Sequence, residues 1–222
     1  MRGNTTPDSF ARRNGLTLVF GALMLLTMVG HALAGWRLGV HAAESEHARP
    51  PTLSHYVASP AFLSSLFENW ESEFLQMGLF VLLTVHFRQK GSSESRPMDP
   101  SDEHEEAVPM RARPWPVHEG GAWLRIYEHS LSAALLLLFA LSFLGHWLWS
   151  WRQSVQAGAH SGHAVGGFIA YLASPELWFE SMQNWQSEFL AVIAIVVLSI
   201  FLREKNSSQS KPVEAPNSKT GV

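Results

Sequence analysis

The chain has 222 residues, no cysteine and a formal net charge of −3, with 46% hydrophobic and 16% charged residues. The lack of cysteine excludes disulfides, thiolate metal sites and cysteine nucleophiles, and the weak net charge gives no field that would favour nucleic acid. A typical soluble domain has about 25% charged residues. The low charged content and the nine tryptophans therefore indicate a membrane protein, because indole rings are enriched at membrane interfaces.

The first apolar run covers residues 16–36 and contains His31 as its only ionisable side chain. A helix of about 20 residues is roughly 30 Å long, which matches the hydrocarbon thickness of a bilayer. The run and its flanks also resemble a cleaved signal peptide. It is longer than a signal-peptide core, however, and a similar run recurs inside the chain at residues 131–151. We therefore expect a membrane span at about 16–36.

A second helix is expected to begin at Pro60, because Ser59 can cap a helix and proline is tolerated at the first helical position. Its apolar part, residues 74–87, would reach only about 21 Å. To cross a bilayer it must include the preceding string NWESEF, residues 69–74. The second span is therefore expected at about 68–88.

The second half of the chain repeats the first at an offset of 115 residues, so that NWQSEF at residues 184–189 aligns with NWESEF. The repeat predicts spans at about 131–151 and 183–203, the last within a helix that begins at Pro175. The predicted fold is all-α: a polytopic membrane protein with four transmembrane helices in two tandem helical hairpin repeats. The expected divisions are a first repeat at 1–97, a polar cytoplasmic linker at 98–125, a second repeat at 126–212 and a disordered tail at 213–222.

Charge distribution predicts the orientation of the chain. Of sixteen Lys and Arg residues, thirteen lie before the first span, between the second and third, or after the fourth. Positive residues favour the cytoplasmic side, so both termini and the linker are expected there. The expected partner is the lipid bilayer, without nucleic acid. Four short spans bury little interior, which favours a homodimer.

Two histidines and two glutamates are expected to form a polar layer near the outer face of the membrane. His31 lies 15 residues into the first span, and Glu73 lies 15 residues from the end of the second. Both are therefore about 22 Å from the inner boundary, and the second repeat contains the same pair. The layer comprises His31, Glu73, His146, Glu188, Asn69 and Asn184, and the repeated motif adds Trp70, Ser72, Trp185 and Ser187.

Three interpretations of this layer remain open. In the first, which we favour, the layer is structural and the protein is a non-enzymatic membrane protein of unassigned biochemical function. In the second, the protein is a small ion or proton conductor or a transporter accessory, because ionisable groups at membrane depth line polar pathways. In the third, imidazole and carboxylate groups hold a metal or haem in a membrane redox protein. We find no nucleophile, nucleotide-binding or metalloprotease motif, and we expect no catalytic residue, metal site or cofactor.

Three segments carry a resemblance to a known family. These are RRNGLTLVFGALMLLTMVGHALAG, NWQSEFLAV and LSIFLREKNSSQSKPVEAP. They resemble a family of bacterial integral membrane proteins that is catalogued only as a domain of unknown function. The resemblance covers nearly the whole chain except the middle linker. It implies four spans, a doubled N-W-x-S-E motif and a location in the bacterial cytoplasmic (inner) membrane, and it implies no activity.

Overall fold

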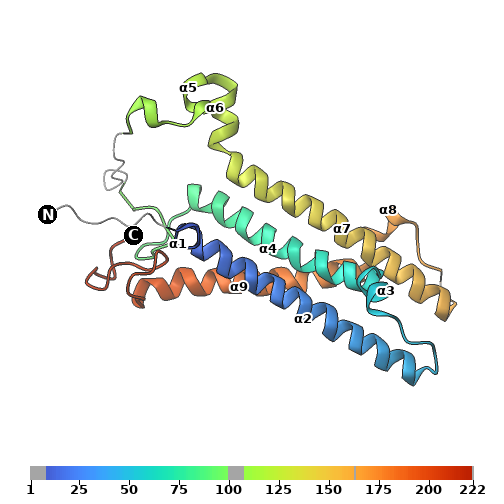
Figure 1. Cartoon of the computed structure of the whole chain (residues 1–222). Coiled ribbons are helices and arrows are strands. Elements are labelled where there is room, and N and C mark those ends of the chain that lie inside the picture. Colours follow the sequence, from blue (N-terminus) through green and yellow to red (C-terminus); the bar gives the residue numbers. More distant parts are fainter. Residues whose placement is uncertain (1–8, 100–107, 163, 222) are drawn as a thin grey trace. The chain divides into compact units, whose positions relative to one another are not determined.

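The computed structural model describes residues 9–99, 108–162 and 164–221. Within these residues every regular element is helical and no strand occurs, which confirms the all-helical prediction (Figure 1). The elements in chain order are α1 (Phe10–Arg13), α2 (Gly15–Ser45), α3 (Leu53–Val57), α4 (Pro60–His86), η2 (Met110–Ala112), α5 (Trp115–Glu119), α6 (Gly121–Glu128), α7 (Ser130–Ser161), α8 (Phe168–Tyr171) and α9 (Pro175–Phe201).

Three of the described helices, α2, α7 and α9, are long and apolar enough to cross a membrane. The helix α4 has 27 residues, as many as α9, but it falls outside this group. The reason is its composition, because Glu68, Glu71 and Glu73 interrupt the apolar sequence. The long helices also extend beyond the predicted spans. For example, α2 continues to Ser45 and α7 to Ser161.

The helices α4 and α9 begin at the two Ser-Pro pairs, as predicted. The Ser174 hydroxyl accepts a hydrogen bond from the Leu177 N–H at 3.2 Å, and the Ser59 hydroxyl accepts one from the Phe62 N–H at 3.3 Å. Each bond satisfies an N–H group that has no partner within the first turn of its helix. The serines therefore fix where these two helices begin.

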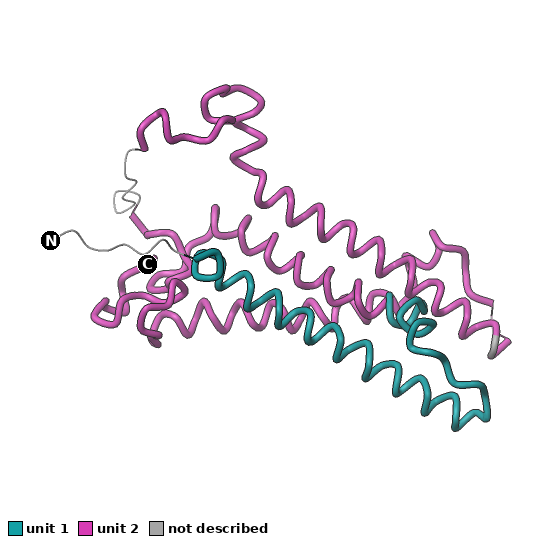
Figure 2. The backbone as a smooth tube through the Cα atoms, viewed as in Figure 1, with its two compact units in different colours: residues 1–63 teal, residues 64–222 magenta. Residues whose placement is uncertain are grey.

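The chain divides into two compact units, residues 1–63 and 64–222, and each is described by itself (Figure 2). In the first unit α3 packs against α2. The indole N–H of Trp36 donates to the Pro51 carbonyl at 2.8 Å. The Tyr56 ring occupies the space that a side chain at Gly35 would need. These contacts fix the return of the chain after α2.

In the second unit α7 lies beside α4 and α9 (Figures 1 and 2). A Cβ atom at Gly145 of α7 would lie 2.6 Å from the Phe67 ring of α4, so this close approach requires glycine. On the α9 side, the rings of Phe139 and Trp185 meet edge to face at 6.1 Å. Small and aromatic residues thus set the spacing of α7 from its neighbours.

Burial in the described residues is the reverse of that in a soluble domain. Four large apolar or aromatic side chains are buried, against thirteen polar or charged ones. Charged side chains are almost never fully buried in proteins unless they are paired. Large apolar side chains are instead exposed along the long helices, such as Leu137 at 61% and Leu190 at 65%. An apolar exterior around a polar interior is the arrangement that suits lipid as the solvent.

The linker predicted at 98–125 contains short helices. Residues 100–107, which include most of its acidic centre, lie outside the described residues. The part from 108 onward forms η2, α5 and the start of α6, where the rings of Trp115 and Trp123 are 5.4 Å apart. The described part therefore has more local structure than its Pro-rich composition predicts, because aromatic residues pack within it.

The segment after α9 is held by hydrogen bonds between side chains and backbone groups, whereas the sequence predicts a disordered tail from residue 213. The ammonium group of Lys211 donates to the carbonyl oxygens of Gly91, Asn217 and Lys219, the last two at 3.2 and 3.0 Å. The Thr220 hydroxyl accepts a hydrogen bond from the Gly91 N–H at 2.9 Å. A buried cation thus ties residues 211–221 to the loop that follows α4.

Candidate functional site

A buried histidine of α7 joins three helices in the second unit. The Nδ1 atom of His146 lies 2.9 Å from Oε2 of Glu71 on α4, and its Nε2 atom lies 3.1 Å from Oε2 of Glu180 on α9. The side chains of His146 and Glu71 are fully buried, whereas the Glu180 side chain is 35% exposed. We call His146, Glu68, Glu71 and Glu180, with their hydrogen-bond partners, the His146 cluster.

The position of His146 follows from the pattern of α7. Ser142, His146, Ser150 and Ser154 recur at a spacing of four and therefore share one face of the helix. The first three are buried. Gly145 stands beside this polar face, and its missing side chain lets α4 approach. The sequence of α7 thus presents a polar face to α4 and α9 and an apolar face elsewhere.

Glu71 receives several hydrogen bonds. Its Oε1 atom accepts one from the Ser181 hydroxyl at 2.7 Å and one from the Trp185 indole N–H at 3.0 Å. Its Oε2 atom faces His146. A buried carboxylate is tolerated where donors replace its lost hydration. Glu71 is therefore held in one geometry by all the groups around it.

Glu180 connects the cluster to a chain of hydroxyl groups. The Ser150 hydroxyl donates to Glu180 Oε2 at 3.0 Å and lies 3.0 Å from the Tyr171 hydroxyl. The Tyr171 hydroxyl lies 2.9 Å from the Ser154 hydroxyl. Hydroxyl groups both donate and accept, so this chain can pass a proton along its length. It runs from the buried imidazole through Tyr171 to Ser154, which is half-buried.

Glu68 adds a third carboxyl group to the cluster. Its side chain accepts a hydrogen bond from the Asn184 amide and is close enough to interact electrostatically with His146, Glu71 and Glu180. Three acidic groups thus surround one imidazole. The charge of a single imidazolium compensates only one of them.

The geometry around His146 requires a shared proton. A neutral imidazole has one N–H donor and one acceptor, but both ring nitrogens here face carboxyl oxygens within hydrogen-bond distance. Two carboxylates would each need a donor. Either the imidazole is doubly protonated, or one of the two carboxyl groups is protonated and donates to it. In either state the cluster binds one proton more than a neutral imidazole and two ionised carboxylates would bind.

The structure brings together only part of the layer expected from the sequence. His146 and Asn184 belong to the cluster, and Trp185 donates to Glu71. Glu73 is exposed and Glu188 is half-buried, and their charges are close enough to interact. Neither is a hydrogen-bond partner of His146 in the described residues.

The remaining expected residues make local contacts. The Asn69 amide donates to the Ser65 carbonyl at 2.7 Å. Ser72 and Ser187 donate to the carbonyl groups three residues before them, at 2.9 and 2.8 Å. Two aromatic contacts complete the set: Trp70 packs on Phe67, and the His31 ring lies 5.0 Å from the Phe62 ring in the first unit.

Sequence reasoning missed Glu68, Glu71 and Glu180 because it followed the positions at which the two repeats agree. At the aligned positions, Glu68 corresponds to Gln183 and Glu71 to Gln186. Two carboxyl groups of the cluster thus stand at positions where the other repeat has a neutral glutamine. That difference, together with the serine spacing on α7, was visible in the sequence.

Among the described residues, no group of three or more His, Asp and Glu side chains is arranged so that it could hold a metal ion. The cluster is spread along its helices, with carboxyl groups on opposite sides of the imidazole. Its arrangement therefore suits hydrogen bonds and shared protons.

Fold and cluster together define an all-helical protein with apolar helices of membrane-spanning length and ionisable groups in its interior. The chain belongs to the family described as Domain of unknown function (DUF6766), whose model matches residues 7–222. This match confirms the family resemblance inferred from the sequence. The chain matches no curated protein and no solved structure.

Proposed function

We propose that the chain is a four-span inner-membrane protein whose His146 cluster takes up and releases protons at the outer side of the membrane. Two tandem hairpins, α2 with α4 and α7 with α9, would supply the spans. In support, α4 and α9 have bounds that differ by 115 residues at both ends, and α2 and α7 begin 115 residues apart. The bond from Trp36 to Pro51 recurs between Trp151 and Gly166, at 3.0 Å.

The orientation follows from the charge distribution, which favours cytoplasmic termini. In that orientation the turns that contain α3 and α8 lie at the outer side, and so does the beginning of α9. Glu180, in the second turn of α9, and Ser154, late in α7, are then the members nearest the outer surface.

The observation that carries the proton role is the excess of acidic groups around His146. With all three glutamates ionised and His146 protonated, the cluster would carry a net charge of about −2. Charged side chains within spanning helices are costly unless they are paired or hydrated. A proton bound anywhere in the cluster reduces this excess charge, which is the physical basis of the proposed uptake.

The path for exchange begins at Glu180, the partly exposed member that contacts His146 directly. The hydroxyl chain of Ser150, Tyr171 and Ser154 ends at the same carboxyl group. Glu71, which is fully buried, would be the inner store. Glu180 is therefore the expected entry for protons from the outer side, and Glu71 lies deeper.

Proton uptake can be tested in liposomes that contain the purified protein and a pH-sensitive dye inside, with an imposed proton gradient. We expect Glu180→Gln to slow proton movement by about tenfold or more, and Tyr171→Phe to slow it less, since Glu180 also faces solvent directly. Glu188→Gln, a glutamate of the same helix outside the cluster, is the matched control. Equal rates for wild-type and empty liposomes would refute a transmembrane pathway.

A bound proton can exchange with the outer side without crossing the membrane. Infrared spectroscopy detects the bound proton directly and so distinguishes storage from transmembrane flux. A protonated carboxyl band at neutral pH that disappears in Glu71→Gln or Glu180→Gln supports the store even in the absence of flux. If no such band is present and liposome flux is absent, the proton role is wrong.

The second candidate function is structural docking of α4, α7 and α9. It is favoured by the full burial of His146, Glu71 and Ser181 and by the hydrogen bonds that each of them makes. A docking cluster predicts that Glu71→Gln changes stability without any change in proton exchange.

A further inference from the structure

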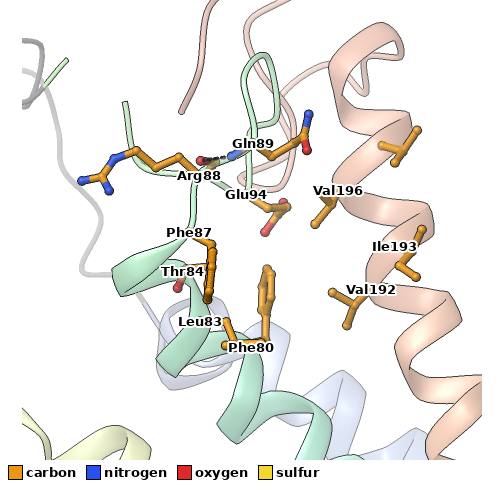
Figure 3. Close-up of a pocket in the computed structure, with 12 residues that line it drawn as sticks. Phe80, Leu83, Thr84, Phe87, Arg88, Gln89, Glu94, Val192, Ile193 and Val196 are labelled. Carbon is orange, nitrogen blue, oxygen red and sulfur yellow. Dashed lines mark hydrogen bonds between the residues drawn. The ribbon is translucent and has the colours of Figure 1, made fainter. Parts of the chain in front are cut away.

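A groove of about 410 Å³ lies between the last turns of α4 and α9, away from the His146 cluster (Figure 3). This volume is within the range of about 300–1,000 Å³ that is common for small-molecule sites. Its apolar wall is formed by Phe80, Leu83 and Phe87 on one side and Val192, Ile193 and Val196 on the other.

Glu94, in the loop after α4, turns its carboxyl group toward this apolar wall (Figure 3). Arg88 also lines the groove, but its guanidinium points away from it (Figure 3). The Arg88 Nε–H donates to the Pro97 carbonyl at 3.0 Å. The groove therefore combines a hydrocarbon-like surface with a carboxylate.

The hydrogen-bond partners of Glu94 among the described residues are neutral. The Ser93 hydroxyl donates to Oε1 at 3.3 Å, and the Gln209 amide, in the orientation that satisfies both groups, donates to both carboxyl oxygens at 3.0 and 3.1 Å. No basic side chain of the described residues forms an ion pair with Glu94. Partial burial raises the pKa of the Glu94 carboxyl. Among the described residues, this carboxylate therefore has no cationic partner.

We propose that the groove binds an aminophospholipid of the surrounding leaflet, with an acyl chain between α4 and α9 and the primary ammonium of the headgroup on Glu94. The ammonium group supplies both the missing charge and N–H donors. A trimethylammonium headgroup has the charge but no N–H donor. A glycerol headgroup has hydroxyl donors but no positive charge, so the carboxylate would repel this net anionic lipid. This proposal requires a membrane location and is independent of the proton role.

The test compares phosphatidylethanolamine, phosphatidylcholine and phosphatidylglycerol with identical acyl chains, each added to detergent-solubilised protein and measured by native mass spectrometry. We expect wild-type protein to bind phosphatidylethanolamine about fivefold more tightly than phosphatidylcholine, because both headgroups are cationic and the difference is the size of one hydrogen bond. Glu94→Gln, which introduces the residue of the aligned position 209, should abolish this preference. Glu204→Gln, an exposed glutamate in the loop after α9, should keep it.

A second variant addresses the apolar wall. Ile193 is 60% exposed, so Ile193→Trp narrows the groove without disturbing a packed interior, and it should weaken binding of all three lipids. Equal binding of the ethanolamine and choline lipids by wild-type protein would overturn the proposal, as would a preference that survives Glu94→Gln. Tighter binding of phosphatidylglycerol would also overturn it. Binding of dodecylamine without any preference for the ethanolamine lipid would assign the groove to free lipophilic amines instead.

Discussion

Replacing Glu71 in two different ways separates its charge from its hydrogen bonds. In the wild-type structure Ser181 and Trp185 donate to Oε1 of Glu71 at 2.7 and 3.0 Å. In Glu71→Gln the amide oxygen can still accept both hydrogen bonds. The amide nitrogen can donate to Nδ1 of a neutral His146, whose Nε2–H then donates to Glu180. Every polar group keeps a partner, so we expect a loss of no more than about 1 kcal/mol in the free energy of unfolding.

Glu71→Ala has a different result. It leaves the Ser181 hydroxyl, the Trp185 indole N–H and one nitrogen of His146 without their acceptor in a buried position. Removing one partner of a buried pair typically costs about 3–5 kcal/mol. We therefore expect Glu71→Ala to be at least about 2 kcal/mol less stable than Glu71→Gln.

The assay is equilibrium unfolding of both variants in lipid nanodiscs or bicelles, followed by tryptophan fluorescence. The control is Glu73→Ala on the same helix, which is exposed and should change stability by less than about 0.5 kcal/mol. If Glu71→Gln is as destabilising as Glu71→Ala, the charge itself holds the cluster together, and the proton-sharing argument fails.

Three further predictions concern other parts of the second unit. Gly145→Ala should cost about 1–3 kcal/mol through overpacking, because the added Cβ would lie 2.6 Å from the Phe67 ring; Gly30→Ala, at the aligned position with no described atom within 4 Å, should not be destabilising in the same unfolding assay. Lys211→Met removes the ammonium that bonds to Gly91, Asn217 and Lys219, so limited proteolysis should cleave residues 212–221 faster, whereas Lys205→Met, an exposed lysine, should leave cleavage unchanged. Burial raises the pKa of Glu94, so the folded state loses stability as pH rises through that pKa. Glu94→Gln should therefore equal or exceed wild type in thermal stability at neutral pH in lipid-free detergent and should lose any advantage on acidification. A wild type that is more stable at neutral pH would contradict this.

The helical architecture was predictable from the sequence for physical reasons. Long apolar runs and Ser-Pro pairs act through local rules, namely the length needed to cross a bilayer and the capping of free N–H groups. The starts of α4 and α9 at Pro60 and Pro175 follow directly. Helix ends were less predictable, since α2 and α7 continue through polar residues that neither favour nor prevent a helix.

The composition of the cluster was not predictable in the same way. Depth in the membrane placed His146 and Glu188 at one level, but contact depends on which face of each helix is turned inward. Glu71 faces α7 and Glu73, two residues later, does not, because successive helical residues are about 100° apart. Deciding between them required the packing of Phe67 on Gly145, a contact between residues far apart in the chain.

The hydrogen bonds of the Lys211 ammonium have a consequence for the order in which parts of the chain fold. The acceptors include the Gly91 carbonyl, which follows α4, and the Lys219 carbonyl, which is more than 120 residues later in the chain. During synthesis the loop after α4 is exposed to solvent while α7 and α9 are still being made. Its hydrogen bonds to Lys211 and Thr220 form only when residues 211–221 have left the ribosome. Formation of these bonds is therefore a late event in biogenesis, because it follows the synthesis of α7 and α9.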